Sequence, residues 1–366
     1  ARIESRSPGT AAGPTTTFGH DAFGNLLWVR SARANAGQGG GTTRFTVDAR
    51  WHTFRTSVTD ALGHATTFST ATPVGCASHP AGAGLVQEER GPNLAPGEAG
   101  LRRCLDAFGR IVRERAPLDL ADVRTVHHDV PGAARVERFA RAAAGERGVT
   151  TWLDGLGRAV ASRSDGPGGR PVLTRRSFDA FGRVAAESAP HFDGEPEPVS
   201  AYGYDVLDRP VRETLPGVGR TTARSFGRGR VTVTDPSGNV RVRHLDPFGR
   251  VVRVEEGEGG SEVTTYAWDA ADQLREIRDP LGHVTSLAYD ALGRRTVLVD
   301  PDTGYTGFSA WDDEGNLLTR VDARGSTTFR YDAIGRLVAR TAGGSTATFE
   351  WDAAPRGKGL LASRSD

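Results

Sequence analysis

The stretch "FRYDAIGRLVAR", from Phe329 to Arg340, decides the fold because close copies of it recur along the chain. An aromatic residue stands before Asp332, and a Gly-Arg pair begins three positions after it. A phrase repeated at a fixed period indicates a repeat architecture, in which each copy is one supersecondary unit. In the most regular part of the chain the aspartates follow one another at 21, 22, 20 and 20 residues, at Asp269, Asp290, Asp312, Asp332 and Asp352.

The same phrase extends upstream with looser spacing, as in "HDAFGNLLWV" around Asp21 and "LDAFGRIV" around Asp106. The repeats therefore cover most of the chain. We predict structural roles for the motif residues Asp21, Gly24, Asp106, Gly109, Arg110, Asp154, Gly157, Arg158, Asp179, Gly182, Arg183, Tyr204, Asp205, Asp246, Gly249, Arg250, Trp268, Asp269, Tyr289, Asp290, Gly293, Arg294, Trp311, Asp312, Gly315, Tyr331, Asp332, Gly335, Arg336, Trp351 and Asp352.

A second, related turn motif lies about halfway between copies, as in "RDPLGHVTSL" at Asp279 and "VDARGSTTF" at Asp322. Two turns in each unit leave segments of about 5 to 8 residues, which is strand length and too short for stable helices. The alternation of side chains also indicates strands, since Leu287 and Tyr289 of "VTSLAYD" fall on one face of an extended chain. The sequence predicts an all-β fold of antiparallel β-hairpin repeats, stacked edge to edge into a long curled sheet.

The chemistry of the motif suits a tight reversal. Asp332 can accept hydrogen bonds from backbone N–H groups two residues on, and Gly335 can take the positive φ that the turn needs. We expect Arg336 to point into solvent or toward neighbouring acids. Asp and Gly are then turn formers, and the aromatic residue before Asp is a core or cross-strand residue.

Two regions lack the period: residues 31–43 and 73–100, both rich in Gly, Ala and Pro. They are expected to be surface loops or insertions. A shorter segment, Pro190 to Ser200, is expected to lengthen one hairpin connection. We divide the chain into a degenerate repeat region, residues 1–101, and a clean array, residues 102–366.

Composition excludes several classes of protein. The 46 basic and 45 acidic side chains nearly cancel, so no nucleic-acid footprint is indicated. No apolar run approaches the ~20 residues of a membrane-spanning helix. Cys76 and Cys104, the only cysteines, could form one bridge or remain separate thiols. The sequence begins at Ala1 and contains no Met, so we expect it to be a piece of a longer polypeptide without a signal peptide of its own.

The phrase Y/W/F-D-x-x-G-R-L/V with its companion D-P/A-x-G-x-x-T/V resembles the rearrangement-hot-spot (Rhs) or YD-repeat family. The closing "EWDAAPRGKGLLASRSD" is similar to a segment of the branch related to bacterial insecticidal toxin-complex B and C subunits. The resemblance implies part of a hollow β-sheet shell that encloses a C-terminal toxic polypeptide for secretion or delivery. It implies a secreted or cell-surface protein whose partners are its own cargo domain and toxin-complex or secretion-system subunits. The family's closing self-cleavage segment is not found before Asp366.

An alternative within the same family is a cell-surface adhesion or glycan-binding module, because related repeats act in adhesion. Exposed aromatic side chains beside aspartate would contact the glycan. The aromatic residues of the regular repeats share one phase and are expected to face one side of the sheet: Trp268, Tyr289, Trp311, Tyr331 and Trp351. A partial array also leaves strand edges open at its ends, so we expect this chain alone to associate more readily than a longer one.

Several motifs suggest chemistry but lack the pattern that the chemistry needs. In "VHHDV", His127 and His128 point to opposite faces of a strand, which disfavours a shared metal site. "FGRGRV" lacks the third glycine of a dinucleotide loop, and "PRGKGL" lacks the Ser or Thr of a phosphate loop. "WDDEGN" at Asp312 lacks the alternating acids and distal Glu of a calcium loop. We therefore predict a structural protein with no catalytic residues, metal or cofactor.

Overall fold

The computed structural model describes residues 2–4, 13–77, 84–142, 145–217 and 220–366, and nearly all of them lie in strands or in the turns between strands. This confirms the predicted all-β class. The strands of the N-terminal half are β1 (Arg2–Glu4), β2 (Thr15–His20), β3 (Leu26–Arg30), β4 (Thr42–Val47), β5 (Arg55–Thr59), β6 (Ala65–Ser69), β7 (Glu88–Arg90), β8 (Leu101–Leu105), β9 (Ile111–Arg115), β10 (Asp122–His128), β11 (Arg135–Ala142), β12 (Gly145–Leu153), β13 (Ala159–Asp165), β14 (Pro171–Phe178), β15 (Val184–Ser188) and β16 (His191–Phe192).

The C-terminal half is built from strands of similar length, joined by short turns. These strands are β17 (Val199–Tyr204), β18 (Pro210–Thr214), β19 (Thr221–Gly227), β20 (Arg230–Thr234), β21 (Val240–Leu245), β22 (Val251–Glu256), β23 (Glu262–Trp268), β24 (Leu274–Arg278), β25 (Val284–Tyr289), β26 (Arg295–Asp300), β27 (Gly304–Trp311), β28 (Leu317–Asp322), β29 (Gly325–Tyr331), β30 (Leu337–Ala342), β31 (Ser345–Trp351) and β32 (Leu361–Ser365).

Helical structure is confined to single turns in the described residues. The α-helix α1 has four residues, and three 3-10 turns sit in connections between strands. None of these helices has the length or apolar content required to cross a membrane. Their bounds are α1 (Ala32–Asn35), η2 (Pro117–Asp119), η3 (Pro167–Gly169) and η4 (Glu258–Gly260).

The strands form one continuous antiparallel sheet. Each strand pairs with the next strand along the chain, except that β14 pairs with both β15 and β16, and β15 then pairs with β17. In the regular repeats a shift of register precedes the aromatic residue of the motif. Between Arg330 and Tyr331 the pairing shifts, and Tyr331 comes opposite Leu337. The same shift places Trp268, Tyr289 and Trp351 in equivalent positions.

Because neighbouring strands run in opposite directions, successive turns alternate between the two long edges of the sheet. The turns that begin with the motif aspartates lie along one edge, which we call the aspartate rim. The intervening turns lie along the other, which we call the companion rim. It carries residues 31–41, 60–64 and 91–100 near the N-terminus, and the turns of Asp235, Asp279 and Asp322 farther on.

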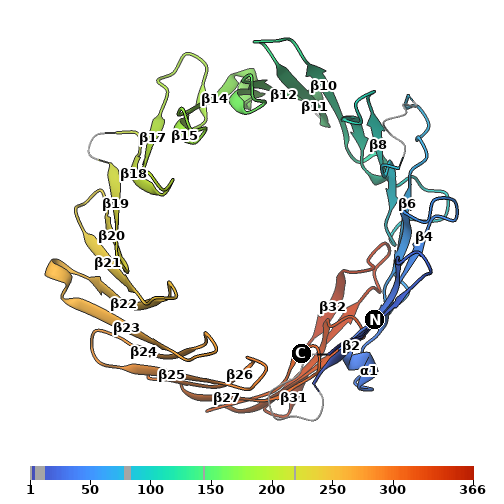
Figure 1. Cartoon of the computed structure of the whole chain (residues 1–366). Coiled ribbons are helices and arrows are strands. Elements are labelled where there is room, and N and C mark those ends of the chain that lie inside the picture. Colours follow the sequence, from blue (N-terminus) through green and yellow to red (C-terminus); the bar gives the residue numbers. More distant parts are fainter. Residues whose placement is uncertain (1, 5–12, 78–83, 143–144, 218–219) are drawn as a thin grey trace.

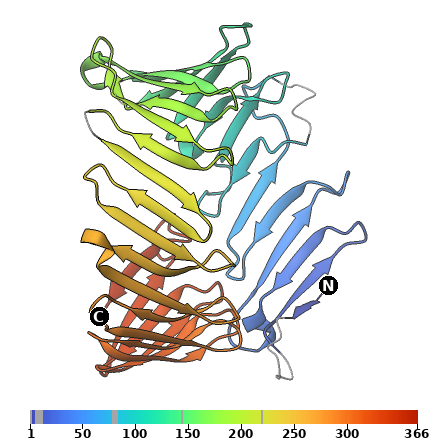
Figure 2. The ribbon, with the colours of Figure 1, turned by 60° about the vertical axis from the view of Figure 1, so that its left-hand side comes forward.

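The sheet curves into a ring, and no described segment crosses its middle (Figure 1). Viewed from the side, the ribbon advances along the axis of the ring as it curves, so the N-terminus lies on the right and the C-terminus on the left (Figure 2). The ring is a single layer: among the described residues the buried hydrophobic side chains are few and scattered, from Ala32 and Leu105 to Ala347. A sheet that packed against a second layer would bury one whole face.

The two aperiodic regions are not simply surface loops. Residues 31–43 contain α1, with Ala32 and Arg33 buried. Residues 73–100 contain β7, which continues the sheet, and Gln87, which is also buried. Most of the described residues in the two regions are exposed or half-buried, as expected of surface loops, but Arg33 contacts Asp312 far away in the sequence and Gln87 bonds to the neighbouring Thr70 and Arg103. Residues 78–83 of the second region lie outside the described residues.

Candidate functional site: the turn ladder and the seam

Each motif turn is held by its aspartate. One carboxylate oxygen of Asp332, Oδ1, accepts hydrogen bonds from the backbone N–H groups of Ile334 (3.0 Å) and Arg336 (2.9 Å). The other oxygen, Oδ2, accepts from Arg336 Nε at 2.7 Å. Gly335 has a φ of 83°, in the left-handed region that favours glycine. The observed turn has the chemistry that the sequence predicted, with the arginine joined to its own aspartate.

The same contacts recur along the aspartate rim. At seven of these turns the aspartate accepts a hydrogen bond from Nε of the arginine four residues later, at 2.7 or 2.8 Å, and the hydrogen bond from Arg209 lowers the pKa of Asp205. The pairs are Asp106 with Arg110, Asp154 with Arg158, Asp179 with Arg183, Asp205 with Arg209, Asp246 with Arg250, Asp290 with Arg294, and Asp332 with Arg336.

The arginine also links one repeat to the next. Arg250 Nη1 donates to the backbone oxygen of Asp269 at 3.1 Å, and Arg294 Nη1 donates to that of Asp312 at 3.3 Å. Arg336 instead reaches the carboxylate of Asp352 with two hydrogen bonds, of 2.8 and 2.7 Å. These arginines thus point toward neighbouring acceptors, which was one of the two orientations expected.

The aromatic residues of the motif pack beneath these arginines. The guanidinium carbon of Arg336 lies 4.9 Å from the ring centre of Trp351, and that of Arg183 lies 4.7 Å from the ring centre of Tyr204. Trp351 Nε1 donates to the backbone oxygen of Leu337 at 2.8 Å. Tyr204, Trp268 and Tyr331 make equivalent bonds to the preceding repeat. The polar atoms of these rings are therefore used inside the sheet.

The largest buried ionic cluster joins the two ends of the ribbon. Arg33 comes from α1, whose first turn is capped by Ser31 through a bond from Ala34 N to Ser31 Oγ at 3.3 Å. Arg33 Nε lies 2.9 Å from Asp312 Oδ2, and the two side chains are only 4% and 2% exposed. Arg33 Nη1 lies 3.4 Å from Glu314 Oε2. A buried guanidinium needs such partners because an unpaired charge is costly in the interior.

Backbone acceptors complete the surroundings of Arg33. Its Nη1 donates to the oxygen of Asp332 at 2.9 Å, and its Nη2 donates to that of Tyr331 at 3.3 Å. Next to it, Gln38 Oε1 accepts from the backbone N–H of Asp313 at 2.9 Å. One short segment of the companion rim thus contacts two successive turns of the aspartate rim.

Two further companion turns continue this contact. His64 Nε2 lies 3.3 Å from Asp352 Oδ2. Asn93 forms a reciprocal pair with Lys358, with Nδ2 donating to the Lys358 oxygen at 3.0 Å and Oδ1 accepting from the Lys358 N–H at 2.7 Å. Arg356 and Glu98 form an ion pair at 2.5 Å. We call the contact between residues 31–98 and residues 312–358 the seam.

The seam defines one circuit of the ring. The residues that it joins are between 258 and 299 positions apart, so the ribbon returns to itself after that length of chain. The contact runs from the companion rim of the N-terminal strands to the aspartate rim of the C-terminal strands, and it leaves the sheet open, without closure into a barrel.

Sequence analysis missed the seam, although one signal for it exists. In the Asp312 turn the fourth residue is Asn316, not arginine, and Asn316 Nδ2 donates to Asp312 Oδ2 at 2.8 Å. Because the motif arginine is missing, the carboxylate is free to receive Arg33 from another part of the chain. In the acidic run "WDDEGN", which lacks the pattern of a calcium loop, Asp312 and Glu314 are ion-pair partners of Arg33.

The other motifs considered for chemistry are occupied by structural contacts. His128 Nε2 lies 3.2 Å from Glu137 Oε2, on the neighbouring strand. "FGRGRV" forms the hairpin between β19 and β20, and "PRGKGL" lies in the seam. The part of the chain that the structure describes contains no group of three or more His, Cys, Asp or Glu side chains placed to hold a metal ion.

Comparison with known proteins agrees with this geometry. A family model described as RHS Repeat matches residues 268–305 and 311–347. The chain carries RHS repeats. The matched stretches agree with the resemblance to the Rhs/YD-repeat family that the sequence motifs carry. No curated protein matches the sequence significantly.

Solved structures resemble these RHS repeats over nearly the whole chain. The crystal structure of TcdB2-TccC3-Cdc42 has a TM-score of 0.60 and 13% identity over 97% of this chain. The structure of the Photorhabdus luminescens Tc holotoxin pore with the mutation TccC3-D651A has a TM-score of 0.56 and 13% identity. This chain spans only 23% of the length of each of those chains. The likeness establishes the RHS-repeat fold and leaves the function of the whole protein to be proposed.

Proposed function

We propose that the chain is a non-enzymatic wall segment of a hollow shell, which encloses a C-terminal toxic polypeptide of the same protein for secretion or delivery. The observation that carries the proposal is the seam: a one-layer ribbon returns to itself after one circuit and docks through buried charges. A ring held in this way surrounds a volume without filling it. The turn ladder and the seam both have a structural role in this proposal, and neither acts in catalysis.

The solved neighbours support the same interpretation at the level of fold, because one is TcdB2-TccC3-Cdc42 and another is a Tc holotoxin pore with a mutation in TccC3. By analogy, this chain would belong to a secreted protein and would meet toxin-complex or secretion-system subunits as partners. The shell would act through its shape and inner surface, with the toxic polypeptide as its cargo.

The test uses the full-length protein that carries this chain. Intact protein is treated with a broad-specificity protease, and the survival of its C-terminal polypeptide is followed by mass spectrometry. We expect that polypeptide to be protected in the folded protein and to be digested quickly after denaturation. Density inside the ring in a cryo-EM map would give independent support. Equal digestion before and after denaturation, with no enclosed density, would rule out encapsulation.

The alternative, glycan binding by the motif aromatics, makes a different prediction. The indole N–H of Trp351 and the hydroxyl of Tyr331 donate to backbone oxygens, and an arginine covers the Trp351 ring. Aromatic residues that stack on sugars need an open face. Binding of this chain to a glycan array, lost in Trp351→Ala, would favour the adhesion role over the shell.

A further inference from the structure

The ribbon has one thin joint, at β7. This strand has three residues and pairs with β6 through three residues. On its other side two residue pairs connect it to β8, Glu88 with Arg102 and Glu89 with Leu101, and Arg103 N of β8 also donates to the oxygen of Gln87, just before β7, at 2.8 Å. Among the described strands this is the shortest ladder that carries the sheet onward. A short ladder offers few hydrogen bonds against local opening.

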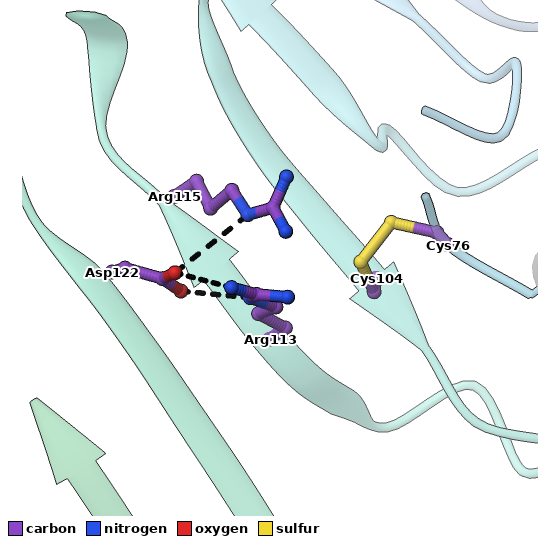
Figure 3. Close-up of a disulfide and its surroundings, with 5 residues drawn as sticks. All are labelled: Cys76, Cys104, Arg113, Arg115 and Asp122. Carbon is purple, nitrogen blue, oxygen red and sulfur yellow. Dashed lines mark hydrogen bonds and ion pairs between the residues drawn. A yellow bond between two sulfur atoms is a disulfide. The ribbon is translucent and has the colours of Figure 1, made fainter. Parts of the chain in front are cut away.

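A disulfide bridges this joint. Cys76 lies in the connection between β6 and β7, and Cys104 lies in β8 (Figure 3). Their Cα atoms are 5.2 Å apart, and 28 positions separate them in the sequence. The bridge therefore ties the chain before β7 directly to the strand after it. It supplies a covalent connection beside the short β7–β8 ladder.

The joint separates the N-terminal block, residues 13–69, from the rest of the sheet. This block carries Arg33 and His64, which dock on the turns of Asp312 and Asp352. That docking is intramolecular, so its strength depends on how closely the joint holds the block in place. A looser joint lowers the effective concentration of Arg33 at its acceptors and weakens the seam.

A reductant reaches the disulfide from the side of Cys76, which is half-buried, whereas Cys104 is buried. A groove of about 390 Å³ is lined by both cysteines and by Arg113 and Arg124. Cys104 lies opposite Arg113 on β9, and Arg113 lies opposite Arg124 on β10, so these three side chains share one face of the sheet. Asp122 neutralises part of this charge through its ion pair with Arg113 (Figure 3). Arg124 is likewise paired, with Glu146 at 3.6 Å, and the charge that remains on the two guanidinium groups lining the groove favours the thiolate that leaves during exchange.

We propose that the Cys76–Cys104 disulfide is a redox-controlled hinge, opened by a dithiol reductant, that governs whether the seam stays docked. A thiolate of the reductant attacks one protein sulfur, forms a mixed disulfide and releases the other cysteine as a thiolate. The second thiol of the reductant then closes a disulfide within the reductant. Both cysteines end as thiols, and the dithiol is oxidised by two electrons. The inference goes beyond the proposed function, because it concerns opening of the ring with or without cargo.

Hydrogen-deuterium exchange of the full chain, with and without dithiothreitol, tests the hinge. Reduction is expected to speed exchange about tenfold or more in β7 and in the seam segments 31–41 and 312–316. Strands β23 to β26, which contact neither the joint nor the seam, should keep their rates. Accelerated exchange confined to residues 73–90, with unchanged exchange in the seam, would show that the disulfide stabilises only the loop around it. That result would overturn the proposal.

A variant separates reduction from other effects of the reagent. The double variant Cys76→Ser/Cys104→Ser should show the faster seam exchange without any reductant and should not respond to dithiothreitol. Wild-type protein supplies the same comparison without mutation if this variant does not fold. The extent of reduction in native buffer is read by maleimide labelling and mass spectrometry. A bridge that resists dithiothreitol until the chain is denatured would also overturn the proposal.

Discussion

Two stretches of the aspartate rim differ in what covers them. Between the turns of Asp106 and Asp246, the residue at the tip of each turn is apolar and open: Phe108 is 77% exposed and Phe248 is 83% exposed. At the seam the equivalent residues are Glu314, which is paired with Arg33, and Ile334, which is 37% exposed. The aspartate and the glycine of the turn are present in both stretches, whereas the Asp312 turn has Asn316 in place of the motif arginine. Among the described residues, the C-terminal part of the aspartate rim is covered by the seam, and the tips between Asp106 and Asp246 are open.

As the pH is lowered, the turns outside the seam should lose stability at a higher pH than the seam turn of Asp352. Hydrogen bonds from Arg209 and the backbone hold the pKa of Asp205 below its usual value of 3.8, and Arg336 above all lowers the pKa of Asp352 much further. A carboxylate with a lowered pKa stabilises the fold above its unfolded-state pKa and loses that contribution as the pH falls through its folded-state pKa.

The expected result is a melting temperature that is nearly constant above about pH 5 and that falls steeply below pH 4, because the turn aspartates are protonated together. Exchange measured at pH 3 should be faster at residues 205–209 than at residues 352–360. A melting temperature that rises as the pH is lowered from 5 to 3 would contradict this account of the turns.

Removing Arg33 should give the largest effect of any single substitution considered. Arg33→Ala leaves Asp312 buried at 2% exposure with only Asn316 near its second oxygen. Breaking a buried ion pair from one side costs about 3 to 5 kcal/mol. We expect the seam to open, with a lower melting temperature and an increased radius of gyration in small-angle X-ray scattering.

The matched control for this substitution is Arg324→Ala. Arg324 lies on the companion rim, in the turn of Asp322, and its side chain is exposed. Its loss should leave both the melting temperature and the radius of gyration unchanged. Equal effects of the two variants would mean that Arg33 contributes no more than an ordinary surface arginine, and the seam would then have another cause.

The repeat could be predicted from sequence because its determinants are local. Asp332, Gly335 and Arg336 lie within five positions, and period-two alternation shows which side chains share a face. The seam could not be predicted from the sequence, because Arg33 and Asp312 meet only through the curvature of the whole sheet. That curvature accumulates from many small strand twists. The aperiodic composition of residues 31–43 indicated a loop and gave no sign of its partner.

Two glycines in one turn outside the seam separate the effect of a positive φ from the other effects of a substitution. Gly157 has a φ of 78°, and a side chain added there would meet nothing within 4 Å, so the cost of Gly157→Ala is conformational alone. That cost is about 1 to 2 kcal/mol. Gly155, two positions earlier, also has open space and no positive φ. Gly155→Ala should be neutral or slightly stabilising in chemical denaturation, and a similar loss in both variants would show that positive φ is not the cause.

The smallest effect on stability should come from substitutions at the tips of the turns. The effect should differ between the two stretches of the aspartate rim. Phe181 is 82% exposed at the tip of a free turn, so Phe181→Ser should change the free energy of unfolding by less than about 0.5 kcal/mol. Ile334 is partly covered beside the seam, so Ile334→Ser should cost more, in proportion to the apolar area that it buries. Binding of the dye ANS should fall in Phe181→Ser and stay unchanged in Ile334→Ser, because only the free tip offers an apolar surface to the solvent. If both variants lost the same stability and the same dye binding, the two stretches of rim would be equally open, and the contrast drawn from their exposure would fail.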